Sequence, residues 1–179
     1  MRNRNALALL ALLVGCAGGE PAETKPVETA EPVVEAPKEE PKPEAKVDLA
    51  AMPEAERVAW LMKRGEEVYK TGGTGGVACS SCHQETGMGV PGAFPPLVGQ
   101  KDLMGDCVHH AGLVVHGLSG EITVNGEKFN GAMPAQGNLP DEEIAAVITY
   151  ARNSWGNAFG NCLPEDVAKA RGLPAPVLK

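Results

Sequence analysis

The chain has 179 residues, including 22 glycines and 15 prolines but only two tryptophans, two tyrosines and three phenylalanines. Apolar residues make up 43% and charged residues 22%, which excludes a wholly disordered chain and a membrane bundle. The net charge of -7 argues against a nucleic-acid-binding protein, which needs a basic surface to neutralise phosphates. All the aromatic residues lie between Trp60 and Phe159, so the chain contains regions of different character.

The first 16 residues have the pattern of an export signal. Arg2 and Arg4 precede an apolar run from Ala6 to Val14. At about 1.5 Å per residue, this run would cover only about half of a ~30 Å hydrocarbon core, so it predicts a signal peptide and not a membrane span. The run ends in Leu-Val-Gly-Cys16, which resembles the lipobox of bacterial lipoproteins, where the cysteine is lipidated. We expect a protein on the periplasmic side, anchored to a membrane through Cys16; an ordinary signal peptide that contains a cysteine is the alternative.

Residues 17–50 consist mostly of Glu, Pro, Ala, Lys and Val and include no aromatic residue. Such a segment buries too little apolar surface to offset the entropy of ordering, so it is predicted to be a disordered tether. The tether would either let a folded domain reach its partners or simply hold that domain clear of the membrane.

The most informative motif is Cys79-Ser-Ser-Cys82-His83. Cys-x-x-Cys-His is the attachment signal for c-type haem, because the two thiols add to the haem vinyl groups and the histidine then lies beneath the iron. A zinc site would need a second pair of ligands at similar spacing, and none is present. A thioredoxin-like dithiol would need a strand-to-helix setting, whereas Cys79 follows the glycine-rich run 71–76. The motif therefore predicts one covalent haem c.

Six downstream residues are candidates for the second iron ligand: Met88, Met104, Met133, His109, His110 and His116. Met88 is only five residues past His83, too near to reach the opposite haem face. Met104 begins a predicted helix, where methionine is more often a core residue. Met133 lies 50 residues after His83, in a predicted loop (129–134) that Gly131 and Pro134 can turn sharply. The spacing favours Met133, whose thioether raises the potential relative to two histidines.

Apolar periodicity predicts a helix near each end of the folded region. The first helical face consists of Val58, Leu61, Met62, Gly65, Val68 and Tyr69, and the second of Ile144, Val147, Ile148 and Ala151. Between them, residues 103–118 predict a third helix. Residues 122–129 alternate around Asn125-Gly126, the strongest short hairpin signal, and lead into the Met133 loop.

Together these features resemble the class I c-type cytochromes over roughly residues 56–157. The resemblance rests on Cys79–His83, Phe94-Pro-Pro-Leu97, Ala132-Met-Pro134 and the helix that ends in Tyr150-Ala-Arg-Asn153. It is greatest, over residues 117–156, to cytochrome domains that serve bacterial dehydrogenases, nitrite reductases and terminal oxidases.

The resemblance implies an all-α cytochrome c fold, with a short β-hairpin before the loop of the axial methionine. The cytochrome domain would span residues 51–162, and residues 163–179 would form a C-terminal tail. The Pro95 carbonyl would accept the imidazole N–H of His83, which fixes the ring. The terminal helices would cross where Gly65 and Tyr69 meet Tyr150.

Cys107 and Cys162 depart from the common family pattern. Because both lie in an exported domain, an intramolecular disulfide is the simplest interpretation. A second metal site formed by Cys107, His109, His110 and Cys162 is an alternative, as are free thiols or an intermolecular bridge.

The sequence therefore predicts a membrane-tethered electron carrier, not an enzyme, that works with a respiratory chain or as a subunit of a periplasmic oxidoreductase. Iron bound by His83 and Met133 would have no open position for a substrate. Redox donors and acceptors would dock near the haem edge, beside a small apolar rim formed by Met88, Val90, Pro91 and Ala93. The alternatives, a peroxidase-like haem enzyme or a gas-binding sensor, require Met133 to dissociate, and the enzyme would need His109 or His110 as a distal acid or base.

Overall fold

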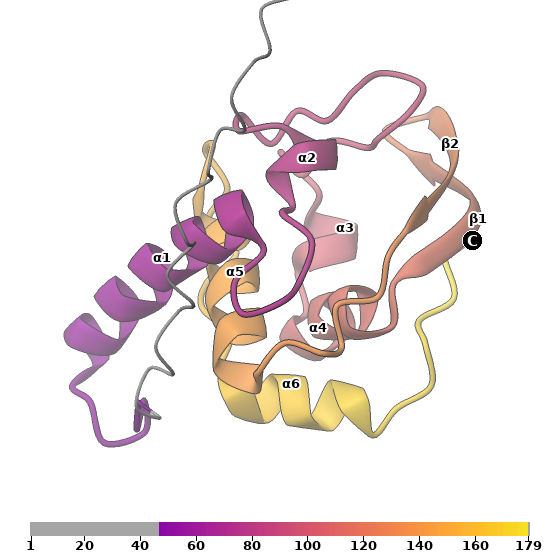
Figure 1. The fold of residues 1–179 in the computed structure, drawn as a ribbon. Helices are drawn as coiled ribbons and strands as arrows, with labels where there is room; N and C mark the ends of the chain where they lie inside the picture. The colour runs from indigo at the N-terminus through magenta and orange to yellow at the C-terminus, as the bar shows by residue number, and fades with distance from the viewer. Residues whose placement is uncertain (1–46, 179) are drawn as a thin grey trace, which may run out of the picture. The chain divides into compact units, whose positions relative to one another are not determined.

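The computed structural model describes residues 47–178. The predicted signal peptide, the lipidation site Cys16 and the predicted tether up to residue 46 lie outside the described residues. Figure 1 shows the elements in chain order: α1 (Glu54–Thr71), α2 (Ser80–His83), α3 (Lys101–Met104), α4 (Cys107–His116), β1 (Leu118–Val124), β2 (Glu127–Met133), α5 (Asp141–Asn153) and α6 (Pro164–Arg171). In this range no helix combines the length and apolar character needed to cross a membrane.

Helices α1 and α5 cross at a close contact, as the sequence predicts (Figure 1). A β-carbon added at Gly65 would lie 2.1 Å from the Ala146 carbonyl oxygen and 2.7 Å from the Tyr150 β-carbon. Only glycine therefore lets the two backbones approach this closely. Tyr69 is fully buried beside the crossing, with its ring centroid 5.5 Å from that of Tyr150 and 5.2 Å from that of Trp155.

The predicted third helix is interrupted. The structure has two helices there, α3 and α4, because the chain leaves helical geometry at Asp106. The Asp106 carboxylate accepts a hydrogen bond from the His109 amide at 2.7 Å and so caps the start of α4. Helix α4 ends at His116 because Gly117 has a φ of 70° and lies against the Met133 carbonyl oxygen, where a β-carbon would be only 2.4 Å away.

The predicted hairpin is present and is longer than expected. Strands β1 and β2 pair antiparallel from Leu118 opposite Met133 to Val124 opposite Glu127. Asn125 and Gly126 form the turn with φ values of 53° and 80°, the left-handed geometry that favours this residue pair. The predicted loop at 129–134 is therefore wrong, because Met133 is the last residue of β2. The strand pairing fixes its position more firmly than a loop would.

The C-terminal region contains a helix, α6, that sequence analysis did not predict within residues 163–179. Pro164 begins the helix, and the Asp166 carboxylate accepts a hydrogen bond from the Leu163 amide at 3.0 Å. Val167 and Ala170 are buried against α4 and α5. Residues 164–171 thus belong to the same core as the preceding helices.

A disulfide joins Cys107, at the start of α4, to Cys162, just before α6, with a Cα to Cα distance of 5.5 Å. The sequence had left this pairing open against a second metal site. In the structure both sulfurs belong to the disulfide and not to a metal site with His109 and His110. Residues 47–178 contain no group of three or more His, Cys, Asp and Glu side chains suited to a metal ion.

Candidate functional site

The Cys79 to His83 motif is folded into a single helical turn. The amides of Cys82 and His83 both donate to the Cys79 carbonyl oxygen, at 3.2 and 2.9 Å. Both thiols in this turn are free and partly buried. Burial raises the pKa of the Cys79 thiol to about 11, so this sulfur stays protonated at neutral pH.

The His83 imidazole is held in a defined orientation. Its Nδ1 lies 2.9 Å from the Pro95 carbonyl oxygen, the contact expected from the sequence. Because a carbonyl only accepts, Nδ1 must carry the hydrogen and Nε2 keeps its lone pair. Burial lowers the pKa of His83, and the bond to Pro95 opposes that shift in part. The ring is thus a neutral imidazole, the form that binds a metal.

The acceptor carbonyl is itself positioned by the loop after the motif. The Leu97 amide donates to the Gly87 carbonyl at 2.7 Å, and Val90 and Phe94 exchange backbone hydrogen bonds of 2.8 Å each. Gly89 has a φ of 64°, and a β-carbon there would lie 2.6 Å from the Pro95 oxygen. The backbone of this loop therefore packs directly against the Pro95 carbonyl, which accepts the hydrogen bond from His83.

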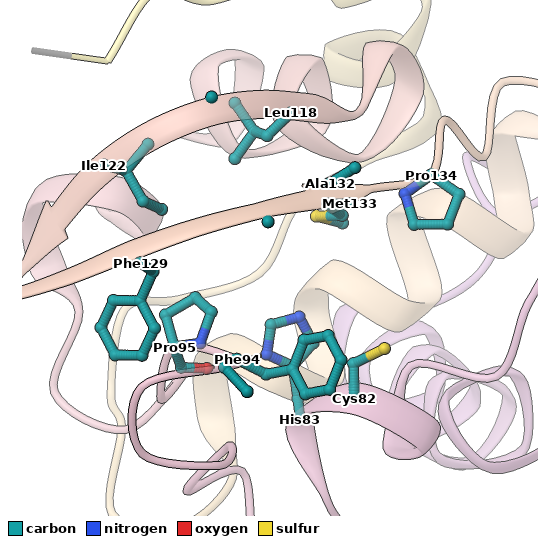
Figure 2. A pocket seen from close by; sticks show the side chains of 13 residues that line it. Cys82, His83, Phe94, Pro95, Leu118, Ile122, Phe129, Ala132, Met133 and Pro134 are labelled. Carbon is teal, nitrogen blue, oxygen red and sulfur yellow. Dashed lines mark hydrogen bonds between the residues drawn. The ribbon is translucent and has the colours of Figure 1, made fainter.

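His83 and Met133 line the same cavity. Figure 2 shows the His83 imidazole on one side of it and the Met133 side chain, at the end of β2, on the other. Two adjoining compartments share these residues: the Cys82 compartment, bounded also by Phe94 and Phe129, and the Cys79 compartment, which extends toward α4 and α5. Counting the open solvent at their mouths, they hold about 520 and 680 Å³ of space outside protein atoms.

The cavity walls are predominantly apolar. In the Cys79 compartment the lining comes from α1, α4 and α5, for example Tyr69, Leu113 and Val147. The hairpin supplies Leu118, Ile122 and, in the Cys82 compartment, Phe129. Sequence reasoning missed these hairpin residues, although the spacing of Leu118 and Ile122, both on one face of β1, was the signal that could have found them.

Of the other candidate ligands, Met88, His109 and His116 do not line the cavity. Met88 is 58% exposed, whereas Met104 is buried and contributes to the wall of the Cys79 compartment. His116 Nε2 lies 3.2 Å from the Ala170 carbonyl oxygen, and His109 is not among the residues that line the cavity. Met88, His109 and His116 are therefore not brought together with His83 and Met133, whereas Met104 lines the same compartment as that pair.

Among the predicted candidate ligands, His110 has an unexpected position for a polar residue. It is buried in the wall of the Cys79 compartment, and its Nδ1 has no hydrogen-bond partner among the described residues. Burial, followed by the positive charge of Arg152, lowers the pKa of His110 to about 3. A buried, unpaired nitrogen is costly, so a polar group of a bound molecule would stabilise it.

Comparison with known proteins supports the assignment drawn from this geometry. The model of the cytochrome c family matches residues 62–155. A cytochrome c-552 of Thermus thermophilus is 40% identical over 102 residues, covering 52% of this chain and 78% of the relative. The cytochrome c subunit of a quinone alcohol dehydrogenase from Gluconobacter oxydans is 35% identical over 102 residues, covering 55% of this chain but only 21% of that subunit. The chain therefore belongs to the cytochrome c family, whose membership implies covalently bound haem c and haem-based electron transfer.

Proposed function

We propose that the protein is an electron carrier with one haem c, held covalently by Cys79 and Cys82 and ligated by His83 and Met133. The observation that carries this proposal is the placement of His83 and Met133 on opposite sides of one apolar cavity, with His83 Nδ1 already engaged by Pro95. The two side chains have the chemistry of an axial pair, a neutral imidazole nitrogen and a soft thioether sulfur.

The two cysteines fit covalent attachment. Each thiol would form a sulfur–carbon bond to one vinyl group of the haem, and its hydrogen would pass to the other vinyl carbon. No external oxidant is needed for this addition. Cys79 and Cys82 line adjoining compartments of the cavity, so both thiols would be available to a group bound there.

The rest of the cavity fits the same group. Its apolar walls suit a macrocycle, and the unpaired Nδ1 of His110 marks a place for one of its polar substituents. Gln100 is also buried in this wall, and its side-chain amide donates a hydrogen bond to the Val98 carbonyl. These two residues would offer hydrogen-bonding groups to the polar substituents of haem.

The bound haem supplies an iron ion that gains and loses one electron. The chain would hold this iron with its own His83 and Met133 side chains, which would leave no position for a substrate. The apolar walls keep water out, and the thioether of Met133 favours the reduced state. We infer a carrier and not an enzyme, because a peroxidase-like alternative needs an open position that Met133 would occupy.

Redox partners would dock on the exposed rim near Cys82. Met88 and Val90 are among the most exposed apolar side chains in the described range, and Ala93 is exposed at the mouth of the Cys82 compartment. The Gly89 amide donates to the His83 carbonyl at 3.0 Å, so this rim is one hydrogen bond from the proposed iron ligand. A small apolar rim suits brief encounters with a donor and an acceptor. The likeness to a dehydrogenase subunit makes a periplasmic dehydrogenase a candidate donor.

We also propose that the carrier is exported and held at a membrane by lipid on Cys16, with residues 17–50 as its tether. Bacterial c-type cytochromes are typically exported to the periplasm. The support for lipid anchoring is the sequence motif, and mass spectrometry of Cys16 after purification from membranes would test it. An unmodified N-terminus on a soluble protein would refute it.

The electron-carrier proposal is tested by the absorption spectrum of the purified holoprotein. We expect the ferric form to show the far-red charge-transfer band of a thioether-ligated haem c, and the ferrous form to bind carbon monoxide slowly. Met133→Ala should abolish the band and bind carbon monoxide rapidly. Rapid, complete binding by the unaltered protein would contradict a closed axial site, and an unchanged spectrum in Met133→Ala would refute that ligand.

A further inference from the structure

Gln136 connects the strand end that bears Met133 to the segment that bears the cysteines. It lies three residues after Met133 and is only 6% exposed. Its side-chain oxygen accepts a hydrogen bond from the Val77 amide at 2.8 Å, two residues before Cys79. Its side-chain nitrogen donates to the Pro134 carbonyl at 3.1 Å, directly after Met133. One amide side chain therefore contacts both halves of the proposed iron site.

The backbone of Gln136 is also fixed. Its amide donates to the Val114 carbonyl in α4 at 2.9 Å, and its carbonyl accepts from the Leu139 amide at 3.0 Å. The side chain thus projects from an anchored point. Its two polar atoms are both satisfied, one as acceptor and one as donor, an arrangement that the similarly shaped glutamate or leucine side chain lacks.

The segment that Gln136 holds is also bonded to Glu143 through Thr74 and to Asn138 through the Gly75 carbonyl, but the bond to Val77 is the one nearest to Cys79. The segment is rich in glycine, with Gly72, Gly73, Gly75 and Gly76 within five residues, so its backbone has many accessible conformations. A β-carbon at Gly76 would lie 2.7 Å from the Gln136 side-chain oxygen, which shows how closely this backbone packs on the amide. Without the Gln136 side chain, the Val77 amide, two residues before Cys79, would lose its buried hydrogen-bond acceptor.

We propose that Gln136 is a positioning residue that holds Met133 in register with the haem-attachment segment and thereby limits how often the methionine sulfur leaves the iron. This inference rests on the proposed function, in which Met133 is an iron ligand. Gln136 touches neither the iron nor His83. Its effect would pass through the Pro134 carbonyl on one side and the Val77 amide on the other.

The test uses the full-length holoprotein and two variants, Gln136→Leu and Gln136→Glu. The first removes both side-chain hydrogen bonds. The second keeps an acceptor for Val77 but sets a carboxylate oxygen against the Pro134 carbonyl. A buried polar group left without its partner shifts such an equilibrium by roughly tenfold, so we expect carbon monoxide to bind the ferrous form of either variant roughly tenfold faster. The ferric thioether band should weaken in both.

Asn138→Ala is the matched control. Asn138 lies two residues away and also contacts the glycine-rich segment, through a 2.7 Å hydrogen bond to the Gly75 carbonyl, but it is exposed and has no hydrogen bond to the Met133 strand end. We expect this variant to bind carbon monoxide within about twofold of the unaltered protein, because an exposed hydrogen bond is readily replaced by water.

The outcomes separate the two proposals. If the unaltered protein shows the thioether band and Met133→Ala loses it, Met133 is the ligand. If both Gln136 variants then behave like Asn138→Ala, the positioning role is overturned while the electron-carrier proposal stands. If Gln136→Leu fails to incorporate haem, the nearly isosteric Gln136→Glu still decides the question, since hydrogen exchange at the Val77 amide reports whether its acceptor remains.

Discussion

Arg64 of α1 and Glu143 of α5 form an ion pair of 2.5 Å in which the side chains are only 11% and 7% exposed. The other oxygen of Glu143 accepts hydrogen bonds from the amide and hydroxyl of Thr74, at 3.0 and 3.1 Å. The Glu143 carboxylate therefore joins α1 and α5 to the glycine-rich segment before Cys79. Glu143 and Gln136 therefore both accept hydrogen bonds from the segment that precedes Cys79, at Thr74 and at Val77.

Replacing Glu143 by Leu should destabilise the protein by about 2–4 kcal/mol. The change removes the inner partner of Arg64 and leaves the Thr74 amide without its acceptor, and breaking a buried ion pair is far more costly than breaking an exposed one. Urea unfolding followed by circular dichroism measures the loss. Glu66→Gln is the control: it breaks the exposed Lys70 pair, which water screens, and should have a much smaller effect than the Glu143 change. Equal effects of the two changes would contradict this role of Glu143.

Gly65→Ala should destabilise the fold by about 3 kcal/mol or more, because the new methyl group would collide with the Ala146 carbonyl at the helix crossing. Thermal unfolding measures the effect. Gly172→Ala provides a comparison, since its β-carbon would meet the nearest atom at 3.5 Å, an ordinary contact, and its φ of -80° suits alanine. A neutral Gly65→Ala variant would show that the helices do not cross at this distance.

Removal of the Cys107–Cys162 disulfide should lower the free energy of unfolding by about 4 kcal/mol. The bridge closes a separation of 55 residues, and in the chain-entropy model the unfolded chain regains the corresponding freedom when it is lost. We expect the paired variant Cys107→Ala/Cys162→Ala to unfold at lower urea with an unchanged haem spectrum. Reductant should shift the unaltered protein and leave the variant as it is; a response of both would point to another cause.

Tyr69 should make the protein sensitive to strong alkali. Its hydroxyl donates to the Gln84 carbonyl at 2.6 Å, and burial raises its pKa well above the usual value near 10. Because the folded pKa is the higher one, this contribution is fully present below about pH 10 and is lost as the pH rises above it, by about 1.4 kcal/mol for each pH unit. Urea unfolding at pH 9 and pH 11 measures the loss. Tyr69→Phe should be less stable at pH 9 by about 1 kcal/mol and should lack that part of the slope.

Much of the fold follows from local chemistry in the sequence. The helical faces around Leu61 and Ile148 and the Asn125-Gly126 turn are each specified by residues close together in the chain, and all three are confirmed. The Cys79 to His83 motif predicts attachment chemistry for the same reason. The contact between His83 and Pro95 is also short in sequence, and it came from a family resemblance and not from periodicity.

The remaining features depend on residues that meet only after folding. The break at Asp106 lies within a run of helix-compatible residues, so one capping carboxylate decided it. Helix α6 buries only Val167 and Ala170 and therefore shows little periodicity. Gln136 resembles any polar loop residue until Val77 and Pro134 are placed around it. Its hydrogen bonds to three separate segments become apparent only in the folded structure.

The disulfide closes residues 107–162 into a covalent ring. Met133 and Gln136 both lie between Cys107 and Cys162 in the sequence, so they sit on a closed covalent circuit that includes the whole hairpin. A single proteolytic cut at the hairpin turn would leave both pieces joined through sulfur. The methionine-bearing strand would then remain near the cavity at high effective concentration, and a nicked molecule could still reform the site.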